Sequence, residues 1–258
     1  MRSLFLMLLK LLQVALEVDG DILSGGLCCG YVVGDGDLAG EHGDRAGAGP
    51  SEQRERQEVM SKLYFKYGAM GSSKSAQALI TKFNYEELGM TVWLIKPSVD
   101  DRDGADIIRS RIGLEQRAQI IKPGESITEA YKKAGRHDVV ISDESQFFTP
   151  EQIDELRELV DDEDTPVLCF GLRTDFLTHF FPGARRLMEL ADSITEIKTV
   201  CACGRKATVN ARIDENGRVI TQGDQVFLGG NDSYVAMCHK CWKRKIAEQR
   251  GQMTIDEI

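Results

Sequence analysis

From residue 62 onward, short hydrophobic runs alternate with longer segments in which apolar positions recur at helical spacing. The runs occupy 62–67 (KLYFKY), 91–95 (TVWLI), 139–141 (VVI) and 167–170 (VLCF). Runs that are rich in β-branched and aromatic residues and lack strict alternation are typical of strands buried on both faces. Strands that alternate with helices form parallel sheets covered by those helices. The pattern therefore predicts an α/β fold with a parallel sheet flanked by helices.

The most clearly marked helix is predicted to run from Pro150 to about Val160. Thr149 can cap its first turn, and proline is favoured at the first helical position. Gln152 stands where a capping box requires a glutamine or glutamate. Another helix is expected to begin near Ala76, after a turn rich in glycine and serine.

The first 59 residues have a different pattern, for which we expect no packed core. An apolar run at 1–18 precedes a Gly- and Asp-rich stretch and a charged run at 51–58, without further periodicity. Lys10 interrupts the apolar run, which is short for a bilayer span, although it also imitates a signal peptide. We interpret 1–59 as a dispensable extension upstream of a natural start at Met60. A disordered regulatory tail is the alternative.

Composition narrows the possible functions. The chain has 258 residues, of which 42% are hydrophobic, enough for one sizeable core and a small satellite. Its formal net charge of −9 disfavours a nucleic-acid partner, because binding a polyanion requires a basic surface. Four of the seven cysteines form two close pairs, which is metal-site spacing in a reducing compartment. We expect a cytoplasmic protein with neither a nucleic-acid nor a membrane partner.

The turn after the first predicted strand has the composition of a phosphate-binding loop. Successive backbone N–H groups and a helix N-terminus can bind the phosphates of ATP there. Lys74 would bridge the β- and γ-phosphates, and the Ser75 hydroxyl would reach magnesium. Ser73 replaces the usual glycine, and a positive φ there would cost on the order of 1 kcal/mol. A Gly/Ser turn without a ligand is the less favoured alternative. The predicted ATP-binding residues of this loop are Gly68, Ala69, Met70, Gly71, Ser72, Ser73, Lys74 and Ser75.

An acidic pair, Asp143 and Glu144, follows the strand predicted at 139–142. A carboxylate at the end of a parallel strand near the phosphate-binding loop can organise magnesium, a role that suits Asp143. Glu144 can then accept the proton of an attacking hydroxyl. A solvated acidic turn is the alternative, which the upstream loop disfavours. Phe147 and Phe148 indicate either a flat ligand nearby or core positions.

Two cysteine pairs near the C-terminus predict a metal site. Cys201 and Cys203 are followed, after 34 residues, by Cys238 and Cys241. Four thiolates presented from turns form a closed tetrahedral zinc site of structural type. His239 is expected at the surface rather than on the metal. Partial pairing of the cysteines as disulfides is the alternative.

The ordered set of motifs from about 60 to 247 resembles the cytosolic, zinc-containing thymidine kinases. The motifs are YGAMGSSKS, KPSVDDRDG with SRIG, VISDESQFF, FGLRTDF, the cysteine pairs and FLGGNDSY. The resemblance implies a P-loop (RecA-like) parallel sheet with a small zinc-binding lasso at the C-terminal end. It also implies a homotetramer. The corresponding boundaries are 60–192 for the ATP-binding domain, 193–247 for the lasso and 248–258 for a tail.

The same resemblance implies a reaction and assigns roles to residues. The γ-phosphate of ATP, bound with Mg²⁺, would pass to the 5′-hydroxyl of thymidine, giving dTMP for nucleotide salvage. Deoxyuridine is expected as a second substrate, because one methyl group changes binding by roughly 1–3 kcal/mol. Glu144 would be the general base, with Asp101 and Asp143 near magnesium and Arg102 facing the transferring phosphoryl group. Met70, Leu172, Phe176 and Phe181 would line the base pocket, while Tyr234 and the backbone of Leu228, Gly229 and Gly230 would hold the sugar and the base edge.

Two other classes of protein share part of this sequence pattern. A P-loop ATPase would use Glu144 to polarise water and would turn over ATP without a nucleoside. A zinc-ribbon binding module with a degenerate nucleotide site would account for Ser73, but the acidic composition counts against it.

Overall fold

The computed structural model describes residues 61–98, 106–225 and 233–251. The chain divides into two compact units, Met1–Val59 and Met60–Ile258, and all described residues belong to the second. The expectation that 1–59 is dispensable lies outside the described residues and stays a prediction. No helix of the described ranges is both long and apolar enough to cross a membrane.

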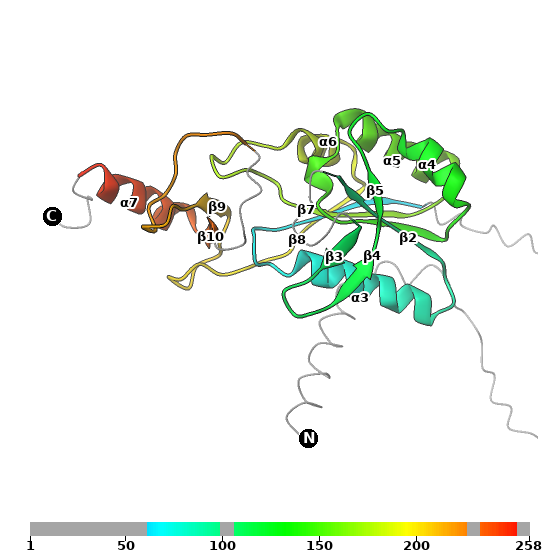
Figure 1. Ribbon diagram of the computed structural model, residues 1–258, viewed down its shortest axis with the longest axis horizontal. Coiled ribbons are helices and arrows are strands. Elements are labelled where there is room, and N and C mark those ends of the chain that lie inside the picture. Colours follow the sequence, from blue (N-terminus) through cyan, green and yellow to red (C-terminus); the bar gives the residue numbers. More distant parts are fainter. Residues whose placement is uncertain (1–60, 99–105, 226–232, 252–258) are drawn as a thin grey trace, which may run out of the picture. The chain divides into compact units, whose positions relative to one another are not determined.

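A six-stranded sheet in the order β5-β2-β6-β7-β1-β8 forms the centre of the second unit (Figure 1). All neighbouring strands of this sheet are parallel, as the sequence predicts. The four predicted strands are β1, β2, β6 and β7, which fill the middle of the sheet. The bounds are β1 (Leu63–Tyr67), β2 (Val92–Pro97), β5 (Gln119–Ile121), β6 (Val139–Ser142), β7 (Val167–Gly171) and β8 (Ser193–Glu196).

Helices cover both faces of the sheet (Figure 1). One face carries α3 (Lys74–Glu87), and the other carries α4 (Ile127–Ala134), α5 (Pro150–Asp162) and α6 (Pro182–Leu190). The predicted capping box starts α5, since Thr149 Oγ1 accepts from the Gln152 N–H and Gln152 Oε1 accepts from the Thr149 N–H. Helix α3 begins two residues before the predicted Ala76, because the phosphate-binding loop already turns into it at Lys74.

The main core lies between the sheet and the layer of α4, α5 and α6. Leu63 and Phe65 of β1 are fully buried in it, and burying one such side chain stabilises the fold by about 1.5–3 kcal/mol. Phe148 is 2% exposed and belongs to this core, so the core interpretation of Phe148 is confirmed. Phe147 is half-buried and packs against its edge.

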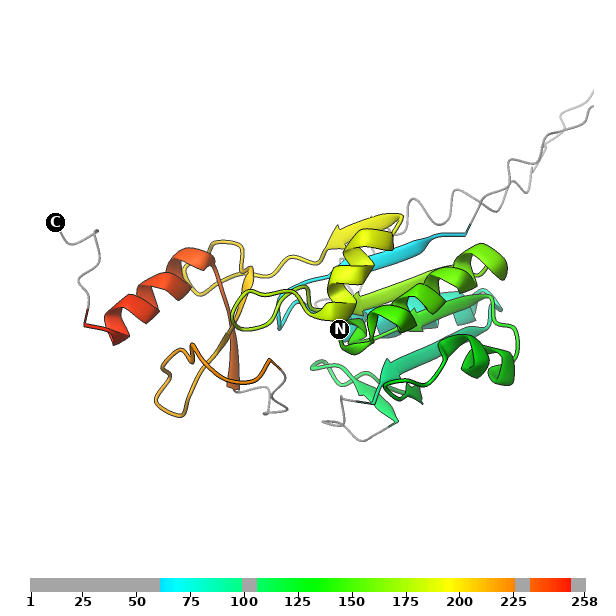
Figure 2. The same cartoon turned by 90° about the horizontal axis from the view of Figure 1, so that it is seen from above.

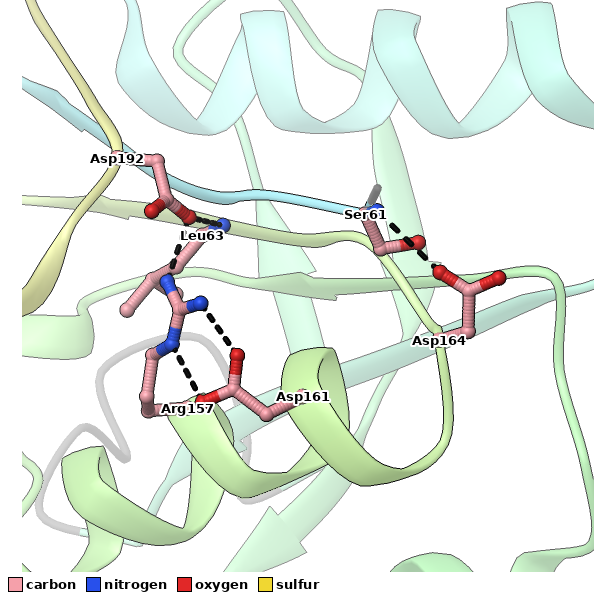
Figure 3. A network of polar contacts seen from close by, with 6 residues as sticks. All are labelled: Ser61, Leu63, Arg157, Asp161, Asp164 and Asp192. Carbon is pink, nitrogen blue, oxygen red and sulfur yellow. Dashed lines mark hydrogen bonds and ion pairs between the residues drawn. The ribbon is translucent and has the colours of Figure 1, made fainter. Parts of the chain in front are cut away.

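Carboxylates fix the beginning of β1 (Figure 3). Oδ2 of Asp192 accepts the backbone N–H of Leu63 at 2.8 Å and pairs with Arg157 at 2.6 Å. Arg157 also donates to Asp161 on the same helix. Beside this network, Oδ1 of Asp164 accepts the N–H of Ser61 at 3.2 Å. These contacts tie α5 and the chain before β8 to the strand that leads into the phosphate-binding loop.

The C-terminal part begins after β8 and has a small core of its own. Strands β9 (Val209–Arg212) and β10 (Tyr234–Met237) pair antiparallel, and α7 (His239–Gln249) follows. Figures 1 and 2 both place this part at the carboxyl ends of the parallel strands. The buried residues of this small hydrophobic core are Cys201, Ala207, Ala211, Met237 and Cys238. Two short elements complete the described fold: a hairpin of β3 (Ile107–Arg109) with β4 (Glu115–Arg117), and the 3₁₀ turn η1 (Ser145–Phe147).

Candidate active site

The phosphate-binding loop curls between the end of β1 and the first turn of α3. Glycine is required at two places: Gly71 has φ +76°, and a Cβ on Gly68 would lie 2.5 Å from the carbonyl oxygen of Ile197. Lys74 is 8% exposed, and its Nζ donates to the carbonyl oxygens of Gly68 and Ala69 at 3.1 Å each. The ammonium group therefore lies within the curl of the loop, next to the backbone that the sequence assigns to the phosphates.

Ser73 adopts the left-handed conformation that its position in the loop suggested. Its φ of 64° and ψ of 28° place it in the αL region as the N-cap of α3, and its side chain makes no capping hydrogen bond. A residue with a Cβ costs on the order of 1 kcal/mol more than glycine in this conformation. The Ser73 side chain is exposed, so it meets no steric obstacle. The expected cost of serine at this position is thus conformational.

Asp143 directly follows β6, and β7 lies between β6 and β1 in the sheet. The first turn of α3 spans this separation, since the side chain of Ser75 hydrogen-bonds to Asp143. Burial, together with the neighbouring charge of Glu144, raises the pKa of Asp143 to about 7, against the opposing effects of Ser75 and Lys74. A buried carboxylate beside a hydroxyl is a donor set that suits a hard divalent cation. Ser75 and Asp143 thus fit the magnesium that accompanies ATP.

Glu144 is held in an unusual backbone conformation directly after Asp143. Its φ of 53° and ψ of 33° are left-handed, a strain that tends to occur at functional positions. Its Oε2 accepts from Nε2 of Gln146 at 2.6 Å, and Oε1 of Gln146 accepts the Leu172 N–H at 2.8 Å. A Cβ on Gly171 would lie 2.6 Å from Gln146 Oε1, so glycine makes room for this bridge. Gln146 therefore fixes the carboxylate of Glu144 relative to the end of β7.

Gln146 is a functional candidate that the sequence analysis missed. It is 1% exposed, but the sequence shows only a glutamine two positions after the acidic pair and not its burial. Its partners, however, come from the ends of two different strands. Only the tertiary structure reveals that it connects them.

The predicted base-pocket residues do not all lie in the same surroundings. Phe176 is 1% exposed, and the guanidinium carbon of Arg212 lies 3.9 Å from its ring centre. The hydroxyl of Tyr234 accepts from Nε of the same arginine at 3.0 Å. Phe181, in contrast, belongs to the main core and packs edge-to-face on Phe147 at 5.5 Å. The structure thus brings Phe176 and Tyr234 together around Arg212, whereas Phe181 belongs to the main core.

Met70 and Leu172 are half-buried at the carboxyl edge of the sheet. Met70 lies in the phosphate-binding loop, and Leu172 follows β7. Their roles in nucleoside binding stay predictions. The roles assigned to Asp101, Arg102, Leu228, Gly229 and Gly230 fall outside the described residues and also stay predictions.

The four predicted ligand cysteines converge. The sulfur atoms of Cys201, Cys203, Cys238 and Cys241 all lie within 4.8 Å of one another, and the Cys203 and Cys238 sulfurs are 3.6 Å apart. Zinc–sulfur bonds of about 2.3 Å in a tetrahedron separate the sulfurs by roughly 3.8 Å, so the cluster has the right size. No disulfide joins these four cysteines in the structure, so all four thiols are available as ligands. His239 is exposed, as expected for a surface residue, and its ring packs edge-to-face on Trp242.

The thiols already share one electrostatic environment. The backbone N–H groups of Cys203 and Cys238 lower the pKa of Cys201 to about 6, and the N–H of Cys241 lowers that of Cys238. The pKa of Cys241 is raised to about 12, chiefly by the thiols of Cys203 and Cys238. A bound cation lets all four thiols ionise together. The donor set therefore fits a zinc ion.

A parallel α/β sheet with this phosphate-binding loop and a buried carboxylate beside Ser75 defines a P-loop nucleotide-binding protein. Its C-terminal part adds a cluster of four cysteines that could hold a metal ion. The family model described as thymidine kinase matches residues 61–242. The chain belongs to the thymidine kinase family, which confirms the resemblance drawn from its motifs.

Individual relatives agree with the family match. The thymidine kinase of Yersinia pseudotuberculosis serotype I (strain IP32953) is 43% identical over 192 residues, covering 72% of this chain and 97% of the relative. That of Legionella pneumophila (strain Lens) is 45% identical over 189 residues, covering 72% and 90%. That of Vibrio vulnificus (strain CMCP6) is 42% identical over 192 residues, covering 73% and 100%. Among solved structures, the Pif1 helicase of Candida albicans aligns with a TM-score of 0.33 at 16% identity, over 55% of this chain and 36% of the helicase, and supports no argument.

Proposed function

We propose that this protein transfers the γ-phosphate of ATP to the 5′-hydroxyl of thymidine and so supplies dTMP in nucleotide salvage. The observation that carries the proposal is the thymidine kinase match over 61–242, which includes the loop with Lys74 and the acidic pair. The relatives that cover most of this chain are thymidine kinases. The arrangement at the carboxyl edge of the sheet supplies the chemistry that this reaction requires.

The phosphate-binding loop holds ATP in this proposal. Its backbone N–H groups and the N-terminus of α3 bind phosphate oxygens, and Lys74 brings a positive charge to the β- and γ-phosphates. Magnesium, bound with ATP, supplies further neutralisation of the phosphate charge, and Ser75 and Asp143 are the described residues that would hold it. The family resemblance implies that Asp101 would act near the same ion and that Arg102 would act on the transferring group.

Glu144 acts as the general base. Its carboxylate accepts the proton of the 5′-hydroxyl while the 5′-oxygen forms a bond to the γ-phosphorus. The bond from the γ-phosphorus to the bridging oxygen breaks, and ADP leaves with that electron pair. Phosphoryl transfer depends mainly on alignment and charge, so the contact with Gln146 that fixes Glu144 contributes to catalysis.

Thymidine binds between the sheet edge and the C-terminal part. Phe176 and Leu172 contribute apolar surface for the base. Met70 and Phe181 form the rest of the pocket lining. Tyr234 and the backbone of 228–230 hold the sugar and the base edge. Because the 5-methyl group of thymine changes binding by roughly 1–3 kcal/mol, deoxyuridine is also a substrate.

The four cysteines bind one structural zinc ion in this proposal. Four protein ligands leave no open coordination position, so the metal holds the two ends of the lasso and takes no part in the chemistry. The family resemblance further supports a cytoplasmic homotetramer. These statements are independent of the reaction and are tested by metal analysis, localisation and molecular mass in solution.

A nucleoside panel tests the proposed reaction. The protein is incubated with ATP and Mg²⁺ and with thymidine, deoxyuridine, deoxycytidine, deoxyadenosine or deoxyguanosine, and nucleotide products and ADP are both measured. We expect stoichiometric dTMP and ADP with thymidine, a weaker reaction with deoxyuridine and no reaction with the purines. ATP hydrolysis at the same rate without a nucleoside would identify an ATPase instead. The absence of any turnover would favour a binding module.

A further inference from the structure

We propose that Arg212 is a positioning residue for the nucleoside pocket, where it fixes the ring of Phe176 and the hydroxyl of Tyr234 relative to each other. The inference rests on the proposed function, because thymidine is the ligand whose binding it affects. Phe176 lies in the β7–α6 connection and Tyr234 begins β10, so the two residues are far apart in sequence. Arg212, on β9, contacts both.

The first contact is a stack on Phe176. Arg212 is 5% exposed, and its guanidinium carbon lies 3.9 Å from the centre of the Phe176 ring. At this distance the planar cation covers one face of the ring. This cation–π attraction is stronger when both groups are desolvated. Phe176 is itself 1% exposed, so the pair is desolvated. The covered face is closed to the base, so Arg212 helps to fix the orientation of the Phe176 ring.

The second set of contacts lies in the plane of the guanidinium. Nε of Arg212 donates to the Tyr234 hydroxyl at 3.0 Å, and Nη2 donates to the carbonyl oxygen of Asp224 at 3.0 Å. Asp224 stands four residues before Leu228, where the residues predicted to hold the sugar begin. A guanidinium donates in its plane while it stacks through its face, whereas the ammonium of lysine does not combine the two. This geometry explains why arginine suits the position.

A second link connects the same two segments. Nε2 of Gln225 donates to Oδ2 of Asp175 at 3.0 Å and to the carbonyl oxygen of Phe180 at 3.2 Å. Asp175 is 4% exposed and directly precedes Phe176. The segment at 224–225 is thus joined to the Phe176 loop both through Arg212 and through Gln225. Of these two residues, Arg212 is the one that also contacts Tyr234.

These contacts predict an effect confined to the nucleoside. The partners of Arg212 named above belong to the β7–α6 connection, to β10 and to 224–225, and all of them lie on the nucleoside side of the proposed site. The phosphate-binding loop reaches the C-terminal part through a different residue, Asn210. Removing the stack should therefore weaken thymidine binding while ATP binding and the chemical step persist.

The test compares Arg212→Lys with wild type in steady-state kinetics on the full chain. Arg212→Lys keeps the charge but loses the stack and the in-plane geometry, so we expect the KM for thymidine to rise by about 10-fold or more. We expect kcat and the KM for ATP to change by less than about 3-fold, because the groups that act on the phosphates stay in place. Arg218→Lys, at an exposed position after β9, is the matched control and should leave all three parameters unchanged.

A double-mutant cycle with Tyr234→Phe distinguishes loss of the contact between Arg212 and Tyr234 from a general loss of structure. Tyr234→Phe removes only the hydroxyl that accepts from Arg212, so the double variant should lose less thymidine affinity than the sum of the two single variants. If Arg212→Lys does not fold, Arg212→Gln takes its place in the same kinetics, because it keeps an in-plane N–H donor but loses the stacked cation; an unchanged KM for thymidine would then overturn the proposal.

The outcomes separate this inference from the proposed function. An Arg212→Lys protein with an unchanged KM for thymidine, or with equal increases in both KM values, would overturn the positioning role. Additive effects in the cycle would also count against it. Wild-type protein that does not phosphorylate thymidine would overturn the proposed function and this inference with it.

Discussion

The backbone N–H of Met70 donates to Oδ1 of Asn210 at 2.8 Å, which places a residue of β9 on the phosphate-binding loop. Asn210 is 3% exposed, and its Nδ2 donates to the carbonyl oxygen of Thr174 at 2.9 Å. One side-chain amide thus joins the loop proposed for ATP, the connection after β7 and the strand beside the cysteine cluster. The two substrate sites of the proposed kinase share this amide.

Asn210→Ala should therefore impair both substrates, in contrast to Arg212→Lys. The substitution leaves the Met70 N–H and the Thr174 carbonyl without this partner, so we expect the free energy of unfolding to fall by about 1–3 kcal/mol. We expect higher KM values for ATP and for thymidine. Urea unfolding and two-substrate kinetics check the prediction, with Asn216→Ala at an exposed turn as the control. A change restricted to thymidine would show that Asn210 does not support the phosphate-binding loop.

Ser73 offers a substitution that should stabilise the protein. Ser73→Gly removes the Cβ from a residue with φ 64°, and we expect a gain of up to about 1 kcal/mol in the free energy of unfolding. Ser73→Ala keeps the Cβ and serves as the matched control, with stability close to wild type. Thermal unfolding measures the gain, and the KM for ATP shows whether the loop binds nucleotide more tightly. If both variants match wild type, the loop tolerates a Cβ at this φ without cost.

Glu144→Gln isolates the proton-accepting role proposed for Glu144. The new side-chain oxygen can still accept from Gln146, so the contact that orients the residue is retained while its basicity is lost. We expect turnover to fall by about 10²–10⁴-fold with thymidine binding nearly unchanged. Kinetics and binding measurements are compared with Glu158→Gln at an exposed position of α5. Turnover near the wild-type value would remove Glu144 from the role of general base.

Much of the fold could be predicted because its central strands are continuous apolar runs. The four central strands, β1, β2, β6 and β7, are buried on both faces, so nearly every position in them carries an apolar residue. The edge strands β5 and β8, with three and four residues, are partly exposed and carry no such pattern. Their sequences read as connections, since edge strands need only one apolar face.

The site was predictable where its residues are adjacent in sequence. Lys74 and Ser75, the acidic pair and the cysteine pairs each form a local motif. Gln146, Asn210 and Arg212 do not, because each also contacts residues far away in sequence: Gln146 and Leu172 are 26 residues apart, and Asn210 and Met70 are 140 apart. A buried polar side chain is recognisable as important only when its hydrogen-bond partners are known.

The cysteine cluster predicts a metal-dependent lasso. Freshly purified reduced protein should contain one zinc ion per chain by metal analysis, because the four sulfurs lie within 4.8 Å of one another. Cys238→Ser should lose most of this zinc and raise the KM for thymidine before it affects ATP binding. Cys169→Ser, in the core strand β7, removes a thiol outside the cluster and should keep the zinc. Wild-type protein without zinc would contradict the proposed metal site.

Asp161 and Asp192 both pair with Arg157, but we expect their replacement by alanine to lower the free energy of unfolding by different amounts. Asp161 pairs with Arg157 at four-residue spacing on α5 and is 47% exposed, a type of ion pair that contributes about 0.3–0.5 kcal/mol. Asp192 also accepts the N–H of Leu63, a residue whose side chain is fully buried at the beginning of the central strand. Asp192→Ala leaves this N–H without its partner, so we expect a loss of about 1–2 kcal/mol.

Asp192→Asn separates the two contributions of Asp192. Asparagine keeps an oxygen that can accept the Leu63 N–H but removes the charge that pairs with Arg157, so its loss should lie between those of Asp161→Ala and Asp192→Ala. Urea unfolding of the three variants measures these differences directly. Equal losses for Asp161→Ala and Asp192→Ala would mean that the ion pairs alone stabilise this region. The hydrogen bond to Leu63 would then not be what holds β1 in place. The strand that leads into the phosphate-binding loop would be held instead by the pairing of β1 with β7 and β8.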